Sequence, residues 1–376
     1  MSDVLVSAEV EERERLARIA GFPVTVLGLV QRGGAADSVA YVGAMLESAL
    51  AELAETFRVV SLFPDTGGNP TLVRRTMFAL RLTIAERNSE CALFNHVGVA
   101  TAQAKLPQRV RRPYALFVHG PEVLDPEMTI TRRRALREAT ITLANSATLA
   151  ARVAEAHPDI KRPLVLPLTL LPAHDGGRVD GALVASVTPR TVVIAGRMSA
   201  GERYKGHDEL LEAWPTVLAK RPDARLAIVG QGDDAKRLEA KSVALGLTGS
   251  VRFTGYVTDS TLDAMLARAA AFALPSRGDG FGLAYLRAMR AALPCIAGAD
   301  DGAREVVEDG VTGTLVPQGD REALGQAVIM MLGDTVRRRT MGEAGKERFE
   351  RQFTYERFVT RLDEIMRDAL TPHMPP

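Results

Sequence analysis

Residues 271–298 read AFALPSRGDGFGLAYLRAMRAALPCIAG, and this stretch decides the fold class. Two short apolar runs, Ala271–Leu274 and Cys295–Ala297, enclose a glycine-rich loop and a stretch of helical period. Apolar strands without polar alternation, separated by helices, are typical of a parallel sheet covered on both faces. The stretch therefore predicts a strand, a loop at its carboxyl end, a helix and a second parallel strand.

The same rhythm runs through both halves of the 376-residue chain. In the first half the apolar runs are Pro23–Val30, Arg58–Leu62, Cys91–Asn95, Tyr114–Val118, Ala139–Leu143 and Leu164–Leu166. After Arg190 they are Thr191–Ala195, Leu226–Val229, Val251–Phe253, Ala271–Leu274, Cys295–Ala297 and Gly313–Val316. Two such series predict two doubly wound α/β domains, residues 1–180 and 187–352, whose boundary lies in the Gly- and Pro-rich segment 172–189. Ligand loops are expected at the carboxyl ends of the strands, and the cleft between the domains is the expected site.

The composition excludes several classes of protein. Hydrophobic residues make up 46% of the chain and charged residues 25%, which excludes disorder, collagen and coiled coil. A net charge of +1 predicts no nucleic-acid partner. Cys91 and Cys295 are far apart in the sequence, so we expect neither a disulfide framework nor a structural zinc site. This cysteine content fits a reducing compartment. The acidic start does not resemble a signal peptide and no apolar run approaches ~20 residues, so we expect a soluble, cytoplasmic protein.

Residues 71–140 are basic although the whole chain is nearly neutral. They contain twelve Lys/Arg and six acidic residues, a balance of +6. The cations are Arg74, Arg75, Arg81, Arg87, Lys105, Arg109, Arg111, Arg112, Arg132, Arg133, Arg134 and Arg137. They lie either on solvated helix faces or on a surface for an anionic lipid or a diphosphate-bearing acceptor.

Two loops of the second half carry residue types that bind a diphosphate. The strand after Arg190 runs into Gly196-Arg197, and Lys205-Gly206 comes just before a helix. Two cations beside the positive end of a helix suit a diphosphate, whereas the alternative is an Arg and a Lys on a surface loop. Gly230-Gln231-Gly232 is either a further ligand loop or an ordinary strand-to-helix turn.

The loop Pro275–Leu283 places three glycines around one carboxylate, Asp279. Backbone N–H groups exposed by the glycines would bind a polyhydroxy ligand, and Asp279 would accept hydrogen bonds from sugar hydroxyls. The alternative is that Asp279 caps the following helix. Because a carboxylate has two oxygens, the two interpretations are compatible.

Within residues 191–320, about a third of the chain, four segments resemble in order the nucleotide-binding domain of glycosyltransferase family 4, the retaining GT-B enzymes of glycosyl transferases group 1. They are GRMSAGERYKGHDELLEAW, RLAIVGQGDDAKRLEA, VRFTGYVTDSTLDAMLARAAAFALPSRGDGFGLAYLRAMRAALPCIAG and REVVEDGVTGTLVPQGD. The resemblance implies a GT-B architecture of two Rossmann-like domains that face an interdomain cleft. The predicted donor-binding residues are Arg197, Lys205, Gly232, Tyr256, Gly280, Phe281, Gly282, Leu283 and Arg287, and the resemblance implies that Asp279 contacts the transferred sugar.

The chain departs from the family pattern at Arg287. The family has a second acid eight positions after the first, where it accepts hydrogen bonds from the ribose hydroxyls, and a guanidinium has no acceptor. Three interpretations follow: the ribose is held in another way, Arg287 donates to the ribose or a phosphate, or donor binding has decayed. In the alternative without function, Arg287 lies on an exposed helix face.

The first domain resembles the family less closely. Gly33 and Gly34 follow the first strand, where the resemblance implies an acceptor-side loop, and a helix-capping turn is the alternative. His119 matches the family's strand-end histidine that faces the donor sugar, so it is the second predicted catalytic residue, and the alternative is a structural histidine. His96 is a weaker candidate, Ser146 is predicted to cap a helix, and residues 353–376 are expected to return to the first domain.

The resemblance implies a retaining, metal-independent glycosyltransferase that moves a sugar from a nucleotide-diphosphate sugar to an acceptor hydroxyl. No DxD motif occurs, so we expect no metal and no cofactor. The acceptor is a glycan, a glycolipid or a small molecule, with peripheral association at the inner face of the membrane. The alternatives are a degenerate GT-B subunit that binds a partner or glycan without transfer, and nucleotide-sugar epimerisation.

Overall fold

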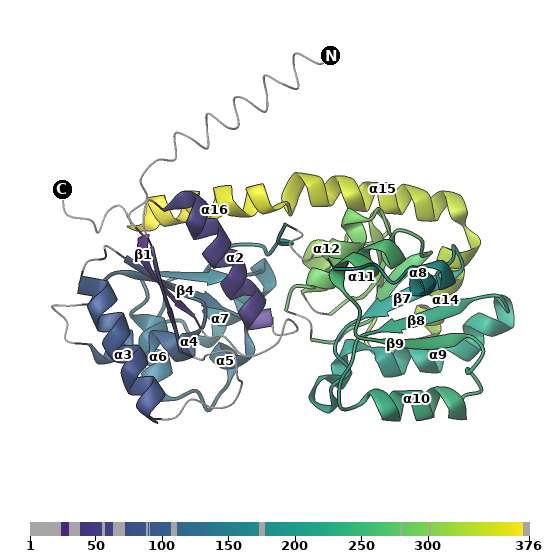
Figure 1. The fold of residues 1–376 in the computed structure, drawn as a ribbon, viewed down its shortest axis with the longest axis horizontal. Coiled ribbons are helices and arrows are strands. Elements are labelled where there is room, and N and C mark those ends of the chain that lie inside the picture. The colour runs from purple at the N-terminus through teal and green to yellow at the C-terminus, as the bar shows by residue number, and fades with distance from the viewer. Residues whose placement is uncertain are drawn as a thin grey trace, which may run out of the picture. The chain divides into compact units, whose positions relative to one another are not determined.

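The computed structural model describes residues 24–29, 38–54, 57–62, 72–87, 89, 91–106, 111–172, 177–278, 280–300 and 302–370. Within this part of the chain, two six-stranded sheets form, and every strand pairing in them is parallel (Figure 1). The predicted doubly wound α/β fold is therefore confirmed.

The first sheet has the strand order β2-β1-β3-β4-β5-β6. Its strands are β1 (Val24–Leu29), β2 (Arg58–Ser61), β3 (Cys91–Phe94), β4 (Tyr114–Val118), β5 (Ile141–Ala144) and β6 (Leu164–Val165). The second sheet has the order β12-β11-β10-β7-β8-β9. Its strands are β7 (Thr191–Ala195), β8 (Arg225–Val229), β9 (Val251–Gly255), β10 (Ala271–Leu274), β11 (Cys295–Gly298) and β12 (Gly313–Val316). A strand overlaps each of the twelve apolar runs identified in the sequence. The strands β3, β4, β5, β10 and β11 are buried throughout, as expected for sheets that helices cover on both faces.

Helices connect these strands. Around the first sheet lie α2 (Ser38–Leu53), α3 (Leu72–Arg87), α4 (Val97–Ala100), η1 (Gln103–Lys105), α5 (Pro121–Leu124), α6 (Ile130–Arg137), α7 (Ala147–Ala156) and α16 (Tyr355–Leu370). Around the second lie α8 (Gly181–Ser186), η3 (Ala200–Lys205), α9 (His207–Lys220), α10 (Ala235–Ala244), α11 (Asp259–Leu266), α12 (Leu283–Arg290), α13 (Ala303–Val306), α14 (Arg321–Gly333) and α15 (Thr335–Gln352). The Ser146 hydroxyl accepts from the Leu149 N–H at 3.2 Å and caps α7, as the sequence predicted.

The chain divides into two compact units, residues 1–167 with 356–376, and residues 168–355. The C-terminal residues from Glu356 onward thus belong to the unit of the first sheet. The second unit begins before the predicted boundary segment 172–189. Leu168 and Leu170 are buried, and the Thr169 hydroxyl donates to the distant Phe353 carbonyl at 2.7 Å, which ties this segment to the second unit.

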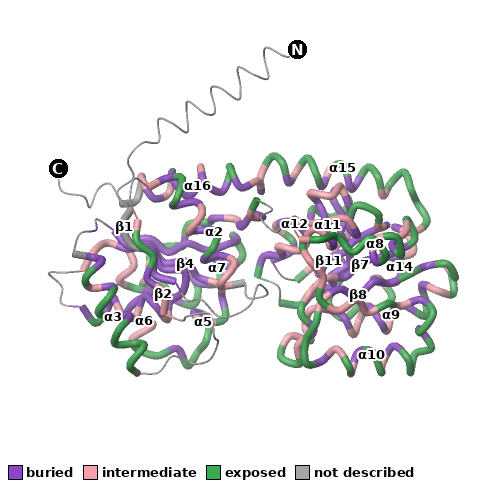
Figure 2. The backbone as a smooth tube through the Cα atoms, in the orientation of Figure 1, coloured by how far each residue is buried: buried purple, intermediate pink, exposed green. Residues whose placement is uncertain are grey.

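Burial follows the layers of each unit. In Figure 2 the strands of both sheets are mostly buried, while the outer faces of the helices are exposed. The largest fully buried side chains include Phe94 and Phe117 in the first unit and Trp214, Phe272 and Tyr285 in the second. Both cysteines are buried and reduced, and burial raises the pKa of the Cys295 thiol. Among the described residues, no helix is long and apolar enough to cross a membrane.

Candidate functional site

The candidate site lies in the second unit, at the edge of the sheet where the parallel strands end. The carboxyl ends of β10, β7, β8 and β9 adjoin in that order, because these strands are neighbours in the sheet. The loops after these strands contain the predicted donor-binding residues except Leu283 and Arg287, which lie in helix α12. In open α/β sheets, ligands bind outside the carboxyl ends of the strands.

The loop after β7 and the loop after β8 are held together by close approach of their backbones. A Cβ atom at Gly232 would lie 1.9 Å from the Met198 carbonyl oxygen, so only glycine fits this position. The Met198 N–H donates to the Gln231 carbonyl at 3.0 Å, and the Asp234 N–H donates to the Met198 carbonyl at 3.0 Å. Gly232 therefore fixes the β8 loop against the β7 loop, and it lies exposed at the edge of the sheet.

The structure brings Arg197 and Lys205 together on one carboxylate. Glu202, in η3, accepts two hydrogen bonds from the Arg197 guanidinium, at 2.7 and 2.8 Å. The Lys205 ammonium lies 3.3 Å from the same carboxylate. The two predicted cations thus converge on a single acceptor, which the sequence analysis did not identify. The signal was present, since Glu202 stands five positions after one cation and three before the other.

The electrostatics of this group favour negative charge. Burial raises the pKa of Glu202, but the hydrogen bond from Arg197 and the charge of Lys205 outweigh it, so the pKa lies below its ordinary value. The carboxylate is ionised at neutral pH and leaves one net positive charge among the three groups. Arg197 is two-fifths exposed, so this charge faces solvent.

The helix after these cations, α9, begins at a constrained position. Gly206 has a φ of +86°, and a Cβ atom there would meet the Pro275 carbonyl oxygen at 2.6 Å. Gly206 has no side chain to cap the helix, so no side chain covers the first-turn N–H groups. His207 is buried at the first helical position, and burial together with the Lys205 charge lowers its pKa to about 4. Its imidazole is therefore neutral at pH 7, and the positive charge here comes from Lys205 and the helix end.

Ion pairs hold α9 in place from the side of α10. Asp208, in the first turn of α9, accepts two hydrogen bonds from Arg237 at 2.9 and 2.6 Å. Lys241 contacts Asp208 and lies 2.5 Å from Glu212. The hydrogen bond from Arg237 lowers the pKa of Asp208 to about 2. Arg237 and Lys241 therefore neutralise the charge of Asp208, so this carboxylate does not cancel the positive potential at the start of α9.

The loop after β10 contacts the loop that carries Lys205. The Arg277 N–H donates to the Tyr204 carbonyl at 2.8 Å, and the Arg277 guanidinium lies 3.0 Å from Glu209 of α9. Phe281 is 3% exposed and its ring packs edge-on against Phe353 at 6.0 Å, so its side chain belongs to the core. Gly280 is exposed, Gly282 caps α12 with a φ of +94°, and Leu283 begins that helix. Asp279 lies outside the described residues.

Arg287 is engaged by helix α11. Its guanidinium donates to Asp259 at 2.7 Å and lies 3.7 Å from Asp263, and its side chain is 15% exposed. The hydrogen bond from Arg287 lowers the pKa of Asp259. The interpretation that Arg287 lies on an exposed helix face is therefore wrong, because two carboxylates hold it. Tyr256, directly after β9, is 65% exposed at the same edge of the sheet.

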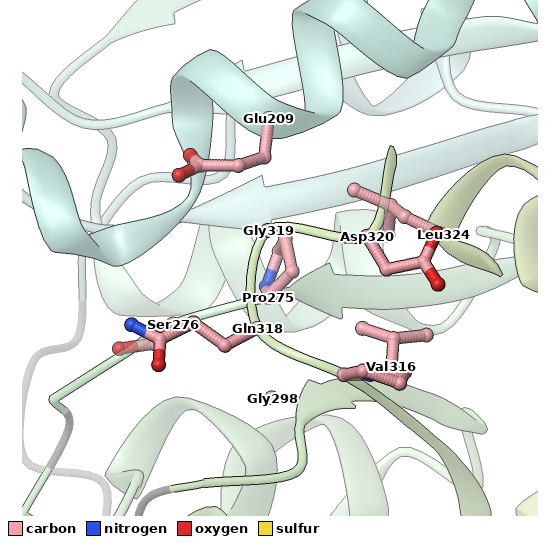
Figure 3. A pocket seen from close by; sticks show the side chains of 10 residues that line it. Glu209, Pro275, Ser276, Gly298, Val316, Gln318, Gly319, Asp320 and Leu324 are labelled. Carbon is pink, nitrogen blue, oxygen red and sulfur yellow. The ribbon is translucent and has the colours of Figure 1, made fainter. Parts of the chain in front are cut away.

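A small cavity opens at the carboxyl ends of β10, β11 and β12 (Figure 3). Its volume is about 10 Å³, which is room for one water molecule. Its lining includes Glu209, Ser276, Gln318 and Asp320, and none of the predicted donor-binding residues. The cavity is therefore too small for a nucleotide and separate from the two cations.

In the first unit, His119 is anchored at the end of β4. Its Nε2 lies 2.7 Å from the Asn95 carbonyl oxygen, and its backbone N–H donates to Glu122 at 2.6 Å. Because a carbonyl only accepts, the Nε2 of His119 carries a proton. The weaker candidate, His96, accepts from the Gly98 N–H at 2.9 Å and caps α4, so it has a structural role. Gly33 and Gly34 lie outside the described residues.

Part of the basic segment 71–140 is used inside the fold. Arg111 donates to the Leu106 and Ala104 carbonyls and to Glu138, which also pairs with Arg134. Arg112 donates to the Glu86 carbonyl at 3.0 Å. These arginines therefore fix the ends of β4 and α6 instead of forming one open surface. Among the described residues, no group of three or more His, Cys, Asp or Glu side chains is placed to hold a metal ion.

Comparison with known structures places this fold in a class. Anabaena HepE, solved with UDP and glucose, superposes with a TM-score of 0.70 at 18% identity over 91% of this chain and 99% of that one. Sucrose-phosphate synthase from Thermosynechococcus elongatus superposes with a TM-score of 0.73 at 19% identity over 93% of this chain and 100% of that one. The expected GT-B fold is confirmed.

The sequence comparisons give the family. The family described as Glycosyl transferases group 1 matches residues 182–348. A GDP-mannose-dependent alpha-(1-6)-phosphatidylinositol monomannoside mannosyltransferase of Mycobacterium tuberculosis is 31% identical over 77% of this chain and 78% of its own. A GDP-mannose-dependent monoacylated alpha-(1-6)-phosphatidylinositol monomannoside mannosyltransferase of Corynebacterium glutamicum is 36% identical over 43% of this chain, and the match spans only 44% of its length. This chain belongs to the group 1 glycosyl transferases, as the sequence motifs predicted.

Proposed function

We propose that this protein transfers a sugar from a nucleotide-diphosphate sugar to an acceptor hydroxyl, with retention of configuration and without a metal ion. One observation carries the proposal: Arg197 and Lys205 converge on a carboxylate at the carboxyl edge of the second sheet. In a group 1 glycosyl transferase, such a pair is suited to hold the donor diphosphate.

Charge balance supports this assignment. When the sugar–phosphate bond breaks, negative charge develops on the departing diphosphate. Arg197, Lys205 and the uncapped N–H groups of α9 supply positive potential at that place. A diphosphate carries more charge than the Glu202 carboxylate, so we propose that it displaces Glu202 from the two cations.

The relatives point to a donor and an acceptor class. Relatives from Corynebacterium and Mycobacterium are named GDP-mannose-dependent, and their names give phosphatidylinositol mannosides as acceptors. We therefore propose GDP-mannose as the first donor to test and a glycolipid as acceptor, which places the protein at the inner face of a membrane. We propose that His119 faces the transferred sugar, as the resemblance to the family implies, with its Nε2 held by the Asn95 carbonyl.

The first experiment removes the cations one at a time. Arg197→Ala or Lys205→Ala should reduce transfer by on the order of 10²–10³, as loss of one transition-state donor does. Arg190→Ala is the matched control, because Arg190 precedes the other end of β7 and also pairs with an acid, Asp223. Near-normal turnover in either site variant, with the sugar donor bound as in wild type, would show that Arg197 and Lys205 do not hold the donor diphosphate.

Two further measurements test the chemistry. Excess chelator should leave turnover unchanged if no metal takes part. The anomeric configuration of the product, read by NMR, should match that of the donor. Loss of activity that added divalent cation restores, or an inverted product, would contradict these two parts separately.

A second candidate function has its own observation. Arg287 stands where the family has an acid, and it is held by Asp259 and Asp263. A protein that no longer binds the donor ribose would be a binding subunit without transfer. Calorimetry with UDP, GDP, ADP and TDP distinguishes the two functions, because the binding subunit predicts no heat with any of them.

A further inference from the structure

Helix α3 exposes a continuous apolar stripe. Val73, Met77, Leu80 and Ile84 are 72%, 45%, 52% and 53% exposed. On a helix that turns ~100° per residue, these four positions fall within about 60° of one another. The opposite face, with Phe78 and Leu82, packs into the core of the first unit. Helix α3 is therefore apolar on two faces, and the described residues of the chain cover only one of them. Figure 2 shows exposed residues along α3.

The charged residues of α3 that flank the stripe are arginines. Arg74 and Arg81 lie on one flank of the stripe, and both are exposed. The acidic residue of α3, Glu86, is fully buried on the inner face. The outer face of α3 therefore combines apolar side chains with arginines, and no acid of this helix reaches it.

The neighbouring edge strand extends this surface. A groove of about 420 Å³ runs between β2 and α3, and its lining includes Arg58 and Val59 of the strand and Arg81 and Ile84 of the helix. Arg58 is exposed and Val59 is 39% exposed. Because β2 is the edge strand of its sheet, no further strand pairs with this side within the described part of the chain. We call the stripe together with Arg58, Arg74 and Arg81 the α3 face.

We propose that the α3 face docks the protein on a bilayer that contains anionic lipids. Apolar side chains flanked by arginines match the boundary between acyl chains and negatively charged headgroups. A second copy of the chain fits less well, because a twofold contact would bring the arginines of one face against those of the other. The proposal extends the proposed transfer to a glycolipid, on which its purpose rests, but docking is measured without any sugar donor.

The test is vesicle flotation of the full chain, without donor or acceptor. Vesicles of phosphatidylcholine with about a third phosphatidylglycerol should carry the wild type, and pure phosphatidylcholine should carry far less. Met77→Ser/Leu80→Ser/Ile84→Ser should weaken binding on the order of tenfold or more. Arg58→Gln/Arg74→Gln/Arg81→Gln should weaken it by roughly fivefold for each arginine, and added salt should weaken the wild type in the same direction.

The control variant is Val336→Ser/Arg337→Gln, which removes an exposed apolar residue and an exposed arginine from α15 in the other unit. It should float like the wild type. The arginine set keeps the proposal falsifiable if the serine set unfolds, and nucleotide binding by calorimetry shows separately whether the donor site works. Equal flotation of wild type and both α3 variants would overturn the proposal, as would light scattering that shows a dimer abolished by these substitutions.

Discussion

The buried carboxyl group of Glu86 makes a sharp prediction about stability and pH. Glu86 lies on the inner face of α3 and is 0% exposed. Burial raises its pKa from 4.5 to about 8, and the nearby charge of Arg112 offsets only part of this effect. The group is therefore neutral in the folded protein at pH 7 and ionised in the unfolded chain.

The direction of the pH dependence follows from proton binding. Between pH 4.5 and about 8 the folded state holds a proton that the unfolded state has released, so the free energy of unfolding falls as the pH rises. The Glu86 contribution is complete below pH 4.5 and is lost as the pH rises through about 8. The slope is about 1.4 kcal/mol per pH unit, which gives a ceiling of about 5 kcal/mol over this range. Water entry and local relaxation reduce the change that we expect to about 2–4 kcal/mol.

Glu86→Gln keeps the shape of the protonated group and cannot ionise. We expect it to match the wild type near pH 5 and to exceed it by about 2–4 kcal/mol at pH 8.5, measured by urea unfolding followed in the first unit. Glu127→Gln is the matched control, because Glu127 is an exposed glutamate of the same unit. Parallel pH profiles for wild type and Glu86→Gln would show that the carboxyl is ionised in the fold and would refute the reasoning.

Three further predictions concern the second unit. Glu202→Gln removes the carboxylate between the two cations and should tighten GDP binding by about threefold to tenfold at low ionic strength. High salt should remove this effect, and an unchanged affinity in calorimetry would contradict the prediction. Gly206→Ala should destabilise the unit by at least about 2 kcal/mol, because its φ is +86° and the Pro275 carbonyl leaves no room; an unchanged melting temperature would show that the turn can relax. Arg287→Glu should lower the free energy of unfolding of this unit by about 1 kcal/mol more than Arg287→Gln does, because it places a third carboxylate beside Asp259 and Asp263. Equal stabilities in urea unfolding would mean that the ion pairs contribute little.

The fold could be predicted from the sequence because the signal is repeated and local. Twelve apolar runs separated by helical stretches favour parallel sheets covered by helices, and a strand overlaps each of the twelve. The domain boundary was less accurate for a physical reason. The Thr169 hydroxyl bonds to the Phe353 carbonyl, 184 positions away, and composition near residue 172 holds no trace of that bond.

Side-chain partners were the part that the sequence did not predict. The positions of Arg197 and Lys205 after a strand and before a helix follow from the loop pattern, but the ion pair with Glu202 depends on the tight turns of η3. The partners of Arg287, Asp259 and Asp263, lie on another helix, 28 and 24 positions earlier in the chain. Whether an arginine faces a ligand or a carboxylate is decided by such packing between helices, which no local pattern records.

The Glu202 carboxylate also limits how tightly the proposed donor can bind. If Arg197 and Lys205 were unpaired before binding, a diphosphate would gain the full attraction of two cations. With Glu202 already on both, binding exchanges one anion for another, and only the difference between a diphosphate and a carboxylate contributes to affinity. The ion pairs with Glu202 keep the two cations close together before the donor arrives, so binding costs little further ordering of their side chains. Such a site gives up some affinity for the donor in return for a fixed geometry. This suits the proposed transfer, in which the nucleoside diphosphate must leave after every turnover.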